Sequence, residues 1–151
     1  MRKQKGFTLI ELLIVIGIIA ILAAIIYVAV DPARRLAEAR NAERWSSVNS
    51  ILNAYLKSTV DNAGTPPATL TAGTSYMIGT GADFAGCSPA TTAVVDLSGL
   101  VDTYLSSVPF DPSTTGASAA KTYYYISQSL NGRVTVGACT PERGVTISVS
   151  R

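Results

Sequence analysis

One acidic side chain, Glu11, interrupts an otherwise apolar run near the N-terminus. The run extends from Phe7 to Val30, 24 residues, which as a helix at about 1.5 Å per residue would span roughly 36 Å. That length is enough to cross the roughly 30 Å hydrocarbon core of a bilayer. A carboxylate in a membrane-spanning helix costs roughly 2.5–3.5 kcal/mol on insertion scales, so by default it marks a functional group with a partner. Glu11 is therefore the first candidate functional residue.

The other polar residues do not form a recognisable catalytic set. The chain has no His, so the usual acid–base pairs and triads are unavailable. Gly79-Thr80-Gly81 lacks the Lys of a phosphate-binding loop. The run Tyr123–Tyr125 is interpreted as strand packing in preference to a stacking platform for nucleic acid or sugar. We predict a protein that is not an enzyme and has no cofactor.

Two cysteines, Cys87 and Cys139, lie 52 residues apart. Metal sites normally combine closer Cys pairs with His, so a disulfide in an oxidising compartment is favoured over two free thiols. Calcium sites gather several oxygen ligands in one loop. Asp96, Asp102 and Asp111 are scattered, and we interpret them as caps of helices and turns. No metal site is predicted.

The charged residues that flank the apolar run bear on its orientation. Arg2, Lys3 and Lys5 precede it, which favours an N-terminus in the cytoplasm. Arginines at positions 34, 35, 40 and 44 favour the reverse. The cysteines and the Ser/Thr/Gly/Ala-rich remainder suit an extracytoplasmic domain, so we expect the first orientation. The run is too long for the 7–15-residue apolar region of an ordinary signal peptide.

The apolar run continues into an amphipathic segment, and we expect helix from Phe7 to about Ser58. Apolar residues fall at helical spacing over Trp45–Leu56 and should face a core. Pro32 either kinks one long helix or begins a second one with Asp31 as its N-cap; both readings remain open. The stretch from Glu38 through Arg40 to Arg44 is interpreted as a solvated, mixed-charge surface.

The part of the sequence that follows the long helix predicts a small β-sheet. Strands are expected around Tyr76–Ile78, over 123–130 and 133–138, and over 145–149. Asn131-Gly132 favours a two-residue type I′ hairpin, which would place Tyr125 opposite Ala138. A short helix is expected over 97–105, capped by Asp96. The fold class is α+β, with the long helix packed on an antiparallel sheet of three to four strands.

The segment MRKQKG followed by FTLIELLIVIGIIAILAAI resembles the N-terminus of type IV pilins and of type II secretion pseudopilins. The likeness rests on a short basic leader of the class III prepilin type ending in Gly6, then Phe7, Thr8, Leu9 and Glu11. A weaker likeness, to major pseudopilins, lies in YLSSVPFDP (104–112) followed by YYYI (123–126). The resemblance covers about 25 residues strongly.

The resemblance implies how the chain is processed and assembled. A prepilin peptidase would cut after Gly6 and N-methylate the new amine of Phe7. The chain would leave the inner membrane and join a helical homopolymer, driven by a platform protein and a cytoplasmic ATPase. Many type IV pilins have a proline within the membrane helix, where this chain has Val28, so any unwound segment is displaced toward Pro32.

The role of Glu11 follows from that cleavage. The cut creates a cationic amine at Phe7, and Glu11 of a neighbouring subunit would neutralise it, which turns two costly charges into one hydrogen-bonded pair and sets the register of docking. Two alternatives remain: Glu11 pairs with its own terminus on the same helix face, or it reaches the membrane interface.

We therefore expect a cleaved leader (1–6), a membrane and assembly helix (7–30), its amphipathic continuation (31–58) and an extracytoplasmic domain (59–151). The expected function is that of the major subunit of a type IV pilus for adhesion, motility or DNA uptake, at the cell surface. Alternatives are the major pseudopilin of a periplasmic type II secretion filament and a tethered binding module that does not polymerise. Without its first six residues the chain has 9 basic and 10 acidic side chains, so nucleic-acid binding is expected only in a DNA-uptake pilus.

Overall fold

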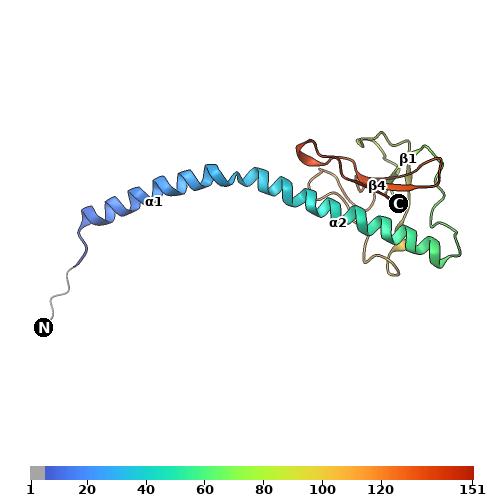
Figure 1. The fold of residues 1–151 in the computed structure, drawn as a ribbon, viewed down its shortest axis with the longest axis horizontal. Helices are drawn as coiled ribbons and strands as arrows, with labels where there is room; N and C mark the ends of the chain where they lie inside the picture. The colour runs from blue at the N-terminus through green and yellow to red at the C-terminus, as the bar shows by residue number, and fades with distance from the viewer. Residues whose placement is uncertain (1–5) are drawn as a thin grey trace. The chain divides into compact units, whose positions relative to one another are not determined.

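The computed structural model describes residues 6–151, so the basic residues at positions 2, 3 and 5 lie outside its described part. Its contacts divide the chain into two units, one that ends at Leu36 and one that comprises Ala37–Arg151. Two helices follow one another, α1 (Leu9–Val30) and α2 (Pro32–Asp61) (Figure 1). We describe each unit by itself.

Helix α1 is apolar on all sides. None of its residues is buried within the chain, which leaves sixteen large hydrophobic side chains between Leu9 and Val30 exposed. An exposed surface of this kind is unstable in water and marks a site that lipid or protein covers. By length and composition, α1 can cross a membrane.

Asp31 separates the two helices. Its backbone is left-handed, with φ 44° and ψ 76°, and its Oδ1 accepts a hydrogen bond from the backbone N of Arg34 at 3.2 Å. Pro32 opens α2, where its missing N–H would have had no helical partner. Of the two readings of this proline, the structure therefore has the second, in which a new helix begins with Asp31 as its N-cap.

A five-stranded sheet covers α2 in the second unit. Its strands are β1 (Ser75–Ile78), β2 (Ala93–Val95), β3 (Tyr124–Gln128), β4 (Val134–Ala138) and β5 (Ser148–Ser150). Their order is β2-β1-β3-β4-β5, and every pair is antiparallel except β1 with β2. The fold is thus α+β as predicted, with one strand more than the sequence indicated.

The additional strand, β2, is only three residues long and runs parallel to β1. Three residues are too few to show an alternating pattern, so the sequence predicts at most four strands. The helix expected over 97–105 is also wrong: only one 3-10 turn forms, Ser98–Leu100, because Val101 adopts an extended backbone. Asp96 is not the N-cap of that turn, which is Leu97 with no side-chain cap hydrogen bond. Asp96 Oδ1 instead accepts from the backbone N of Ser98 at 2.7 Å, two residues on, as in an Asx turn.

The β3–β4 hairpin has a different register from the predicted one. Tyr124 pairs with Ala138 and Tyr125 with Gly137. Beyond the strand ends, Ser129 N donates to Arg133 O at 2.8 Å, which leaves residues 130–132 as a three-residue loop in which Gly132 has φ 81°. A loop longer by one residue slips the register by one, which moves every side chain of β4 to the other face. The observed slip places Val134, Val136 and Ala138 on the same face as Tyr124.

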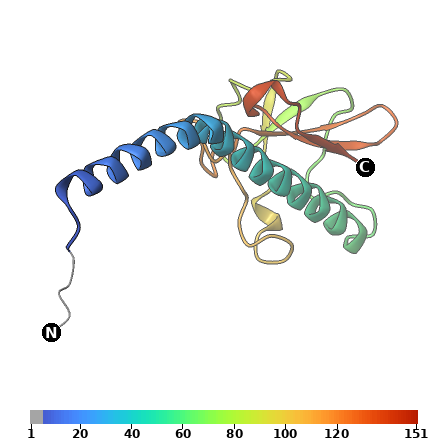
Figure 2. The same ribbon diagram turned by 60° about the vertical axis from the view of Figure 1, so that its left-hand side comes forward.

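That shared face forms the hydrophobic core with α2. Buried helix residues Val48, Ile51, Leu52 and Tyr55 pack against the sheet, as Figure 2 shows for the helix and the strands that cover it. Burial of each such side chain contributes about 1.5–3 kcal/mol. The predicted face was correct over these residues but not at its first one, because Trp45 remains 41% exposed.

Candidate functional site

The acidic residue of the apolar run lies in the first turn of α1. The backbone N and the Oγ1 of Thr8 each donate to Glu11 Oε2 at 2.8 Å, and Glu11 N donates to Thr8 Oγ1 at 3.3 Å. This is a capping box, in which an N-cap hydroxyl and an N3 carboxylate satisfy helix-end groups reciprocally. The negative charge also lies near the positive end of the helix dipole.

Gly6 and Phe7 precede this capped turn as non-helical, exposed backbone, and the side chain of Phe7 is 88% exposed. The peptide bond between them is therefore accessible in the isolated chain. Because α1 begins at Leu9 with Thr8 as its N-cap, the expected cleavage point between Gly6 and Phe7 lies outside the helix. The two Thr8 hydrogen bonds to Glu11 both terminate on Oε2.

A second polar site lies inside the globular unit, around Arg44 of α2. The Arg44 side chain is fully buried. Its Nε and Nη2 donate to the two carboxylate oxygens of Asp111 at 2.7 and 3.0 Å, and its Nη1 donates to Glu142 Oε2 at 2.8 Å. We call this group, completed by Asn41 and Ser113, the Arg44 cluster. It corrects the prediction that Arg44 belongs to a solvated surface.

The Arg44 cluster joins three segments that are far apart in the sequence. Asp111 Oδ1 also accepts from the backbone N of Ser113 at 2.9 Å and of Thr114 at 2.8 Å, which shapes the turn after Pro112. Asn41 and the backbone of Glu142 exchange two hydrogen bonds, of 2.9 and 3.1 Å. The cluster therefore holds the 111–114 turn and the 142–144 turn against α2.

The charges of the cluster shift one another's titration. Burial alone would raise the pKa of Asp111, but the hydrogen bond from Arg44 and those from Ser113 and Thr114 outweigh it and lower this pKa to about 2. The hydrogen bond from Arg44 likewise lowers the pKa of Glu142. Asp111 is thus ionised over the whole neutral and mildly acidic range.

The sequence did contain a signal for this cluster. Asn41 and Arg44 lie seven and four residues before Val48, so they share a helix face with the buried residues at 48, 51 and 55. The predicted apolar face begins at Trp45, because the stretch from Glu38 through Arg40 to Arg44 is interpreted from its charges as a solvated surface. Asp111, which was interpreted as a turn cap, has that role and is also the buried partner of Arg44.

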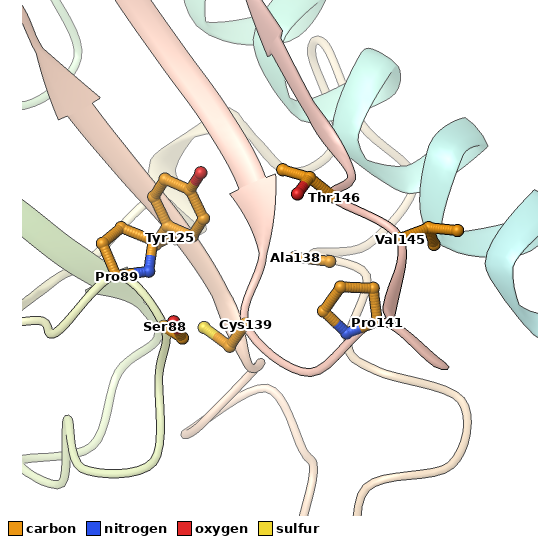
Figure 3. A pocket seen from close by; sticks show the side chains of 8 residues that line it. All are labelled: Ser88, Pro89, Tyr125, Ala138, Cys139, Pro141, Val145 and Thr146. Carbon is orange, nitrogen blue, oxygen red and sulfur yellow. The ribbon is translucent and has the colours of Figure 1, made fainter. Parts of the chain in front are cut away.

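Cys87 and Cys139 form the predicted disulfide. Beside it lies a shallow hollow of about 320 Å³, in which Tyr125 and Pro89 lie next to each other across from Pro141 (Figure 3). The eight side chains that line it include no carboxylate, amine or guanidinium group. Over residues 6–151, no group of three or more His, Cys, Asp or Glu side chains is placed to hold a metal ion.

Comparison with known proteins bears on the N-terminal segment first. Residues 1–27 match the family model described as the prokaryotic N-terminal methylation motif. The chain is also 47% identical over 60 residues to the type IV wide pilus major component PilA4 of Thermus thermophilus. That match covers 40% of this chain and 38% of the length of the relative. No solved structure matches the chain.

An apolar N-terminal helix long enough to cross a membrane, followed by a helix packed on a small sheet, makes this an α+β protein whose fold is consistent with that of pilins. The methylation motif and the PilA4 similarity both concern part of the chain, and both are similarities to proteins of the type IV pilin class.

Proposed function

We propose that the chain is the precursor of the major subunit of a type IV pilus, which serves adhesion, motility or DNA uptake at the cell surface. The observation that carries this proposal is the prepilin-type motif over residues 1–27, in which an exposed Gly6–Phe7 bond precedes the Glu11 capping box. The exposed apolar surface of α1 supports polymerisation, since it must be covered by lipid before assembly and by neighbouring helices after it.

The proposed processing changes the charge next to Glu11. Hydrolysis of the Gly6–Phe7 bond adds water, leaving a carboxylate on Gly6 and an ammonium group on Phe7. Transfer of a methyl group from a methyl donor to that amine, with release of one proton, replaces one N–H by N–CH3 and leaves the amine cationic. Removal of residues 1–6 also removes Arg2, Lys3 and Lys5, so the basic residues that favour cytoplasmic retention of the N-terminus are lost in the same step.

After this cleavage, the ammonium group of Phe7 is a cation with which Glu11 can pair. The Thr8 bonds end on Oε2, so Oε1 is the oxygen at which we place the Phe7 ammonium of an adjacent subunit. In a low-dielectric bundle of helices, pairing two opposite charges avoids the large cost of leaving either one alone. A single such pair in each subunit selects one axial register, as a single buried polar residue does in a coiled coil.

The proposal assigns the parts of the chain as follows: a leader (1–6), a membrane and assembly helix (7–30), its continuation (31–58) and an extracytoplasmic domain (59–151). The partners are copies of the same chain, a prepilin peptidase, an inner-membrane platform protein and a cytoplasmic ATPase. Before assembly the N-terminus is cytoplasmic, and the disulfide-bonded domain lies on the oxidising side of the membrane.

The test uses filaments sheared from cells, viewed by electron microscopy, with mass spectrometry of the subunit. We expect fibres that contain this chain beginning at N-methylated Phe7. We expect Glu11→Gln, which keeps size and hydrogen bonding but removes the charge, to abolish fibres, whereas Glu11→Asp retains some. A chain that still begins at Met1 on the cell, or normal fibres from Glu11→Gln, would contradict the proposal.

A further inference from the structure

The globular unit carries an exposed groove near the start of α2. The groove, of about 510 Å³, is lined by Glu38, Asn41, Ala42 and Trp45 of α2 and by Arg143 and Val145 of the turn that follows β4. Trp45 is 41% and Val145 45% exposed. Tryptophan is enriched among the residues that dominate binding energy at protein interfaces. We call this the Trp45 groove.

A protruding apolar side chain lies elsewhere on the same unit. Leu130, in the three-residue loop between β3 and β4, is 88% exposed. Its neighbours in the loop are polar, and Arg133 beside it is exposed as well. This loop needs turn residues such as Asn131 and Gly132, but nothing in its geometry requires a leucine. We call Ser129–Gly132 the Leu130 tip.

The groove and the tip lie at opposite ends of the globular unit. Asn41, in the groove, bonds to the backbone of Glu142. Arg151 Nη1, in contrast, donates to Asn53 at 2.6 Å, and the backbone of Arg151 pairs with Val134, where β4 begins. Asn41 and Asn53 are twelve residues apart in α2, about 18 Å along its axis. In Figure 2 the β3–β4 turn (orange) lies at the end of the sheet away from the 142–144 turn (red).

From this arrangement we infer that the Leu130 tip of one copy inserts into the Trp45 groove of the next copy of the same chain. Leu130 would cover the Trp45 and Val145 side chains, and Arg133 would meet Glu38 on the rim. This inference rests on the proposed function, because it requires a polymer.

The second copy is the fitting occupant because the two surfaces differ and lie at opposite ends. A patch and a different complementary patch on one chain form a heterologous contact, which generates an open helical array unless the rotation closes a ring. The contact cannot be made within one chain. It would add a contact between globular units to the one that α1 supplies in the proposed filament.

The experiment uses the full chain, expressed in cells with its assembly machinery. Leu130→Lys and Trp45→Glu should each lower the yield of sheared filaments by about tenfold, as expected when an interface residue of this kind is lost. The double variant should recover to within about threefold of wild type, because Lys and Glu then meet across the contact. Val60→Lys, which places the same charge on an apolar side chain that is 76% exposed and outside both surfaces, should assemble normally.

Photo-crosslinking gives the contact directly. Benzoylphenylalanine at position 130 in intact filaments should yield a dimer band in which residue 130 of one copy is attached to the tryptic peptide 45–57 or 144–151 of another. The disulfide and the amount of each variant in the membrane report folding. A dimer linked elsewhere, or no recovery in the double variant, would overturn the inference while leaving the proposed function intact. Absence of wild-type filaments would overturn both.

Discussion

At the scale of single residues, two charged side chains sit in apolar surroundings and are stabilised in different ways. Glu11 accepts from Thr8 within its own helix turn, so it needs no distant element to be held in place. Arg44 depends on Asp111 and Glu142, which lie 67 and 98 residues away in sequence. The first can form as soon as α1 does, whereas the second forms only in the folded domain.

Asp111→Asn should strongly destabilise the globular unit, because it leaves the buried Arg44 guanidinium facing a neutral partner. Removing one member of a buried ion pair costs about 3–5 kcal/mol. Urea unfolding of the detergent-solubilised chain, followed by tyrosine and tryptophan fluorescence, measures the loss. The matched control is Asp83→Asn, which removes the exposed partner of Lys121 and should leave the midpoint almost unchanged. Equal effects of the two variants would contradict the structural role of the cluster.

The lowered pKa of Asp111 predicts how the stability of the globular unit changes with pH. The folded-state pKa of Asp111 is about 2, below its ordinary value of 3.8, so the unfolded chain takes up its proton first as pH falls. The stability it contributes is therefore complete above about pH 4 and is lost toward pH 2. In unfolding measurements between pH 2 and 6, the gap in stability between wild type and Asp111→Asn should narrow below pH 4. If the difference in free energy of unfolding between wild type and Asp111→Asn instead grew as the pH fell, the predicted direction of the pH dependence would be wrong.

At the scale of elements, short polar segments determine where helices and strands begin. Asp31 and Pro32 start a new helix where the apolar run ends, and a hairpin loop one residue longer than predicted accompanies the register that buries Val134, Val136 and Ala138 of β4. In both places a local backbone conformation with positive φ is required, 44° at Asp31 and 81° at Gly132.

Gly132→Ala should destabilise the hairpin, because a side chain at positive φ is strained by about 1–2 kcal/mol. The measurement is the urea midpoint, with hydrogen exchange of the β3 and β4 amides to localise the effect. Gly99→Ala is the control, since Gly99 has an ordinary φ and a Cβ there meets open space. If Gly99→Ala cost as much as Gly132→Ala, the loop conformation would not be the cause.

The disulfide should contribute substantially to the stability of this small domain. Closing a loop of 52 residues is worth about 4 kcal/mol in the chain-entropy model. Replacing both Cys87 and Cys139 with Ser should lower the unfolding midpoint by a corresponding amount, whereas reduction of the double variant should have no further effect. An unchanged midpoint would mean that the remaining core alone determines stability.

At the scale of the whole molecule, an apolar helix with no buried residue is attached to a unit with its own core. The first part exposes its apolar side chains unless lipid or protein covers them, whereas the second buries its apolar side chains within itself. This division fits the proposed function, in which α1 lies in a membrane before assembly and against other copies after it.

The orientation in the membrane can be tested with intact spheroplasts. In cells that lack the prepilin peptidase, so that the leader is kept, we expect protease added from outside to digest the globular unit and to leave an epitope at the N-terminus protected, because the basic residues at positions 2, 3 and 5 favour the cytoplasm. Permeabilised cells provide the control in which both ends are digested. Protection of the globular unit together with loss of the N-terminal epitope would reverse the topology.

The sequence by itself determined the features that depend on neighbours along the chain: the apolar length of residues 7–30, the position of Glu11, the new helix at Asp31-Pro32 as one of two readings, and the strands around Tyr123–Leu130. Residue type and period are sufficient for these, since the forces that act are local or involve only the solvent. The pairing of Cys87 with Cys139 was also within reach, because the chain offers no other partner.

The tertiary structure alone decided the burial of Arg44 against Asp111, the one-residue register of the β3–β4 hairpin and the parallel strand β2. In each case the outcome depends on a group far away in sequence. A guanidinium is buried only if carboxylates can be brought to it, and a hairpin register is chosen by which face the core requires. Those partners are assembled by folding, so their effect cannot be read from the residues beside them.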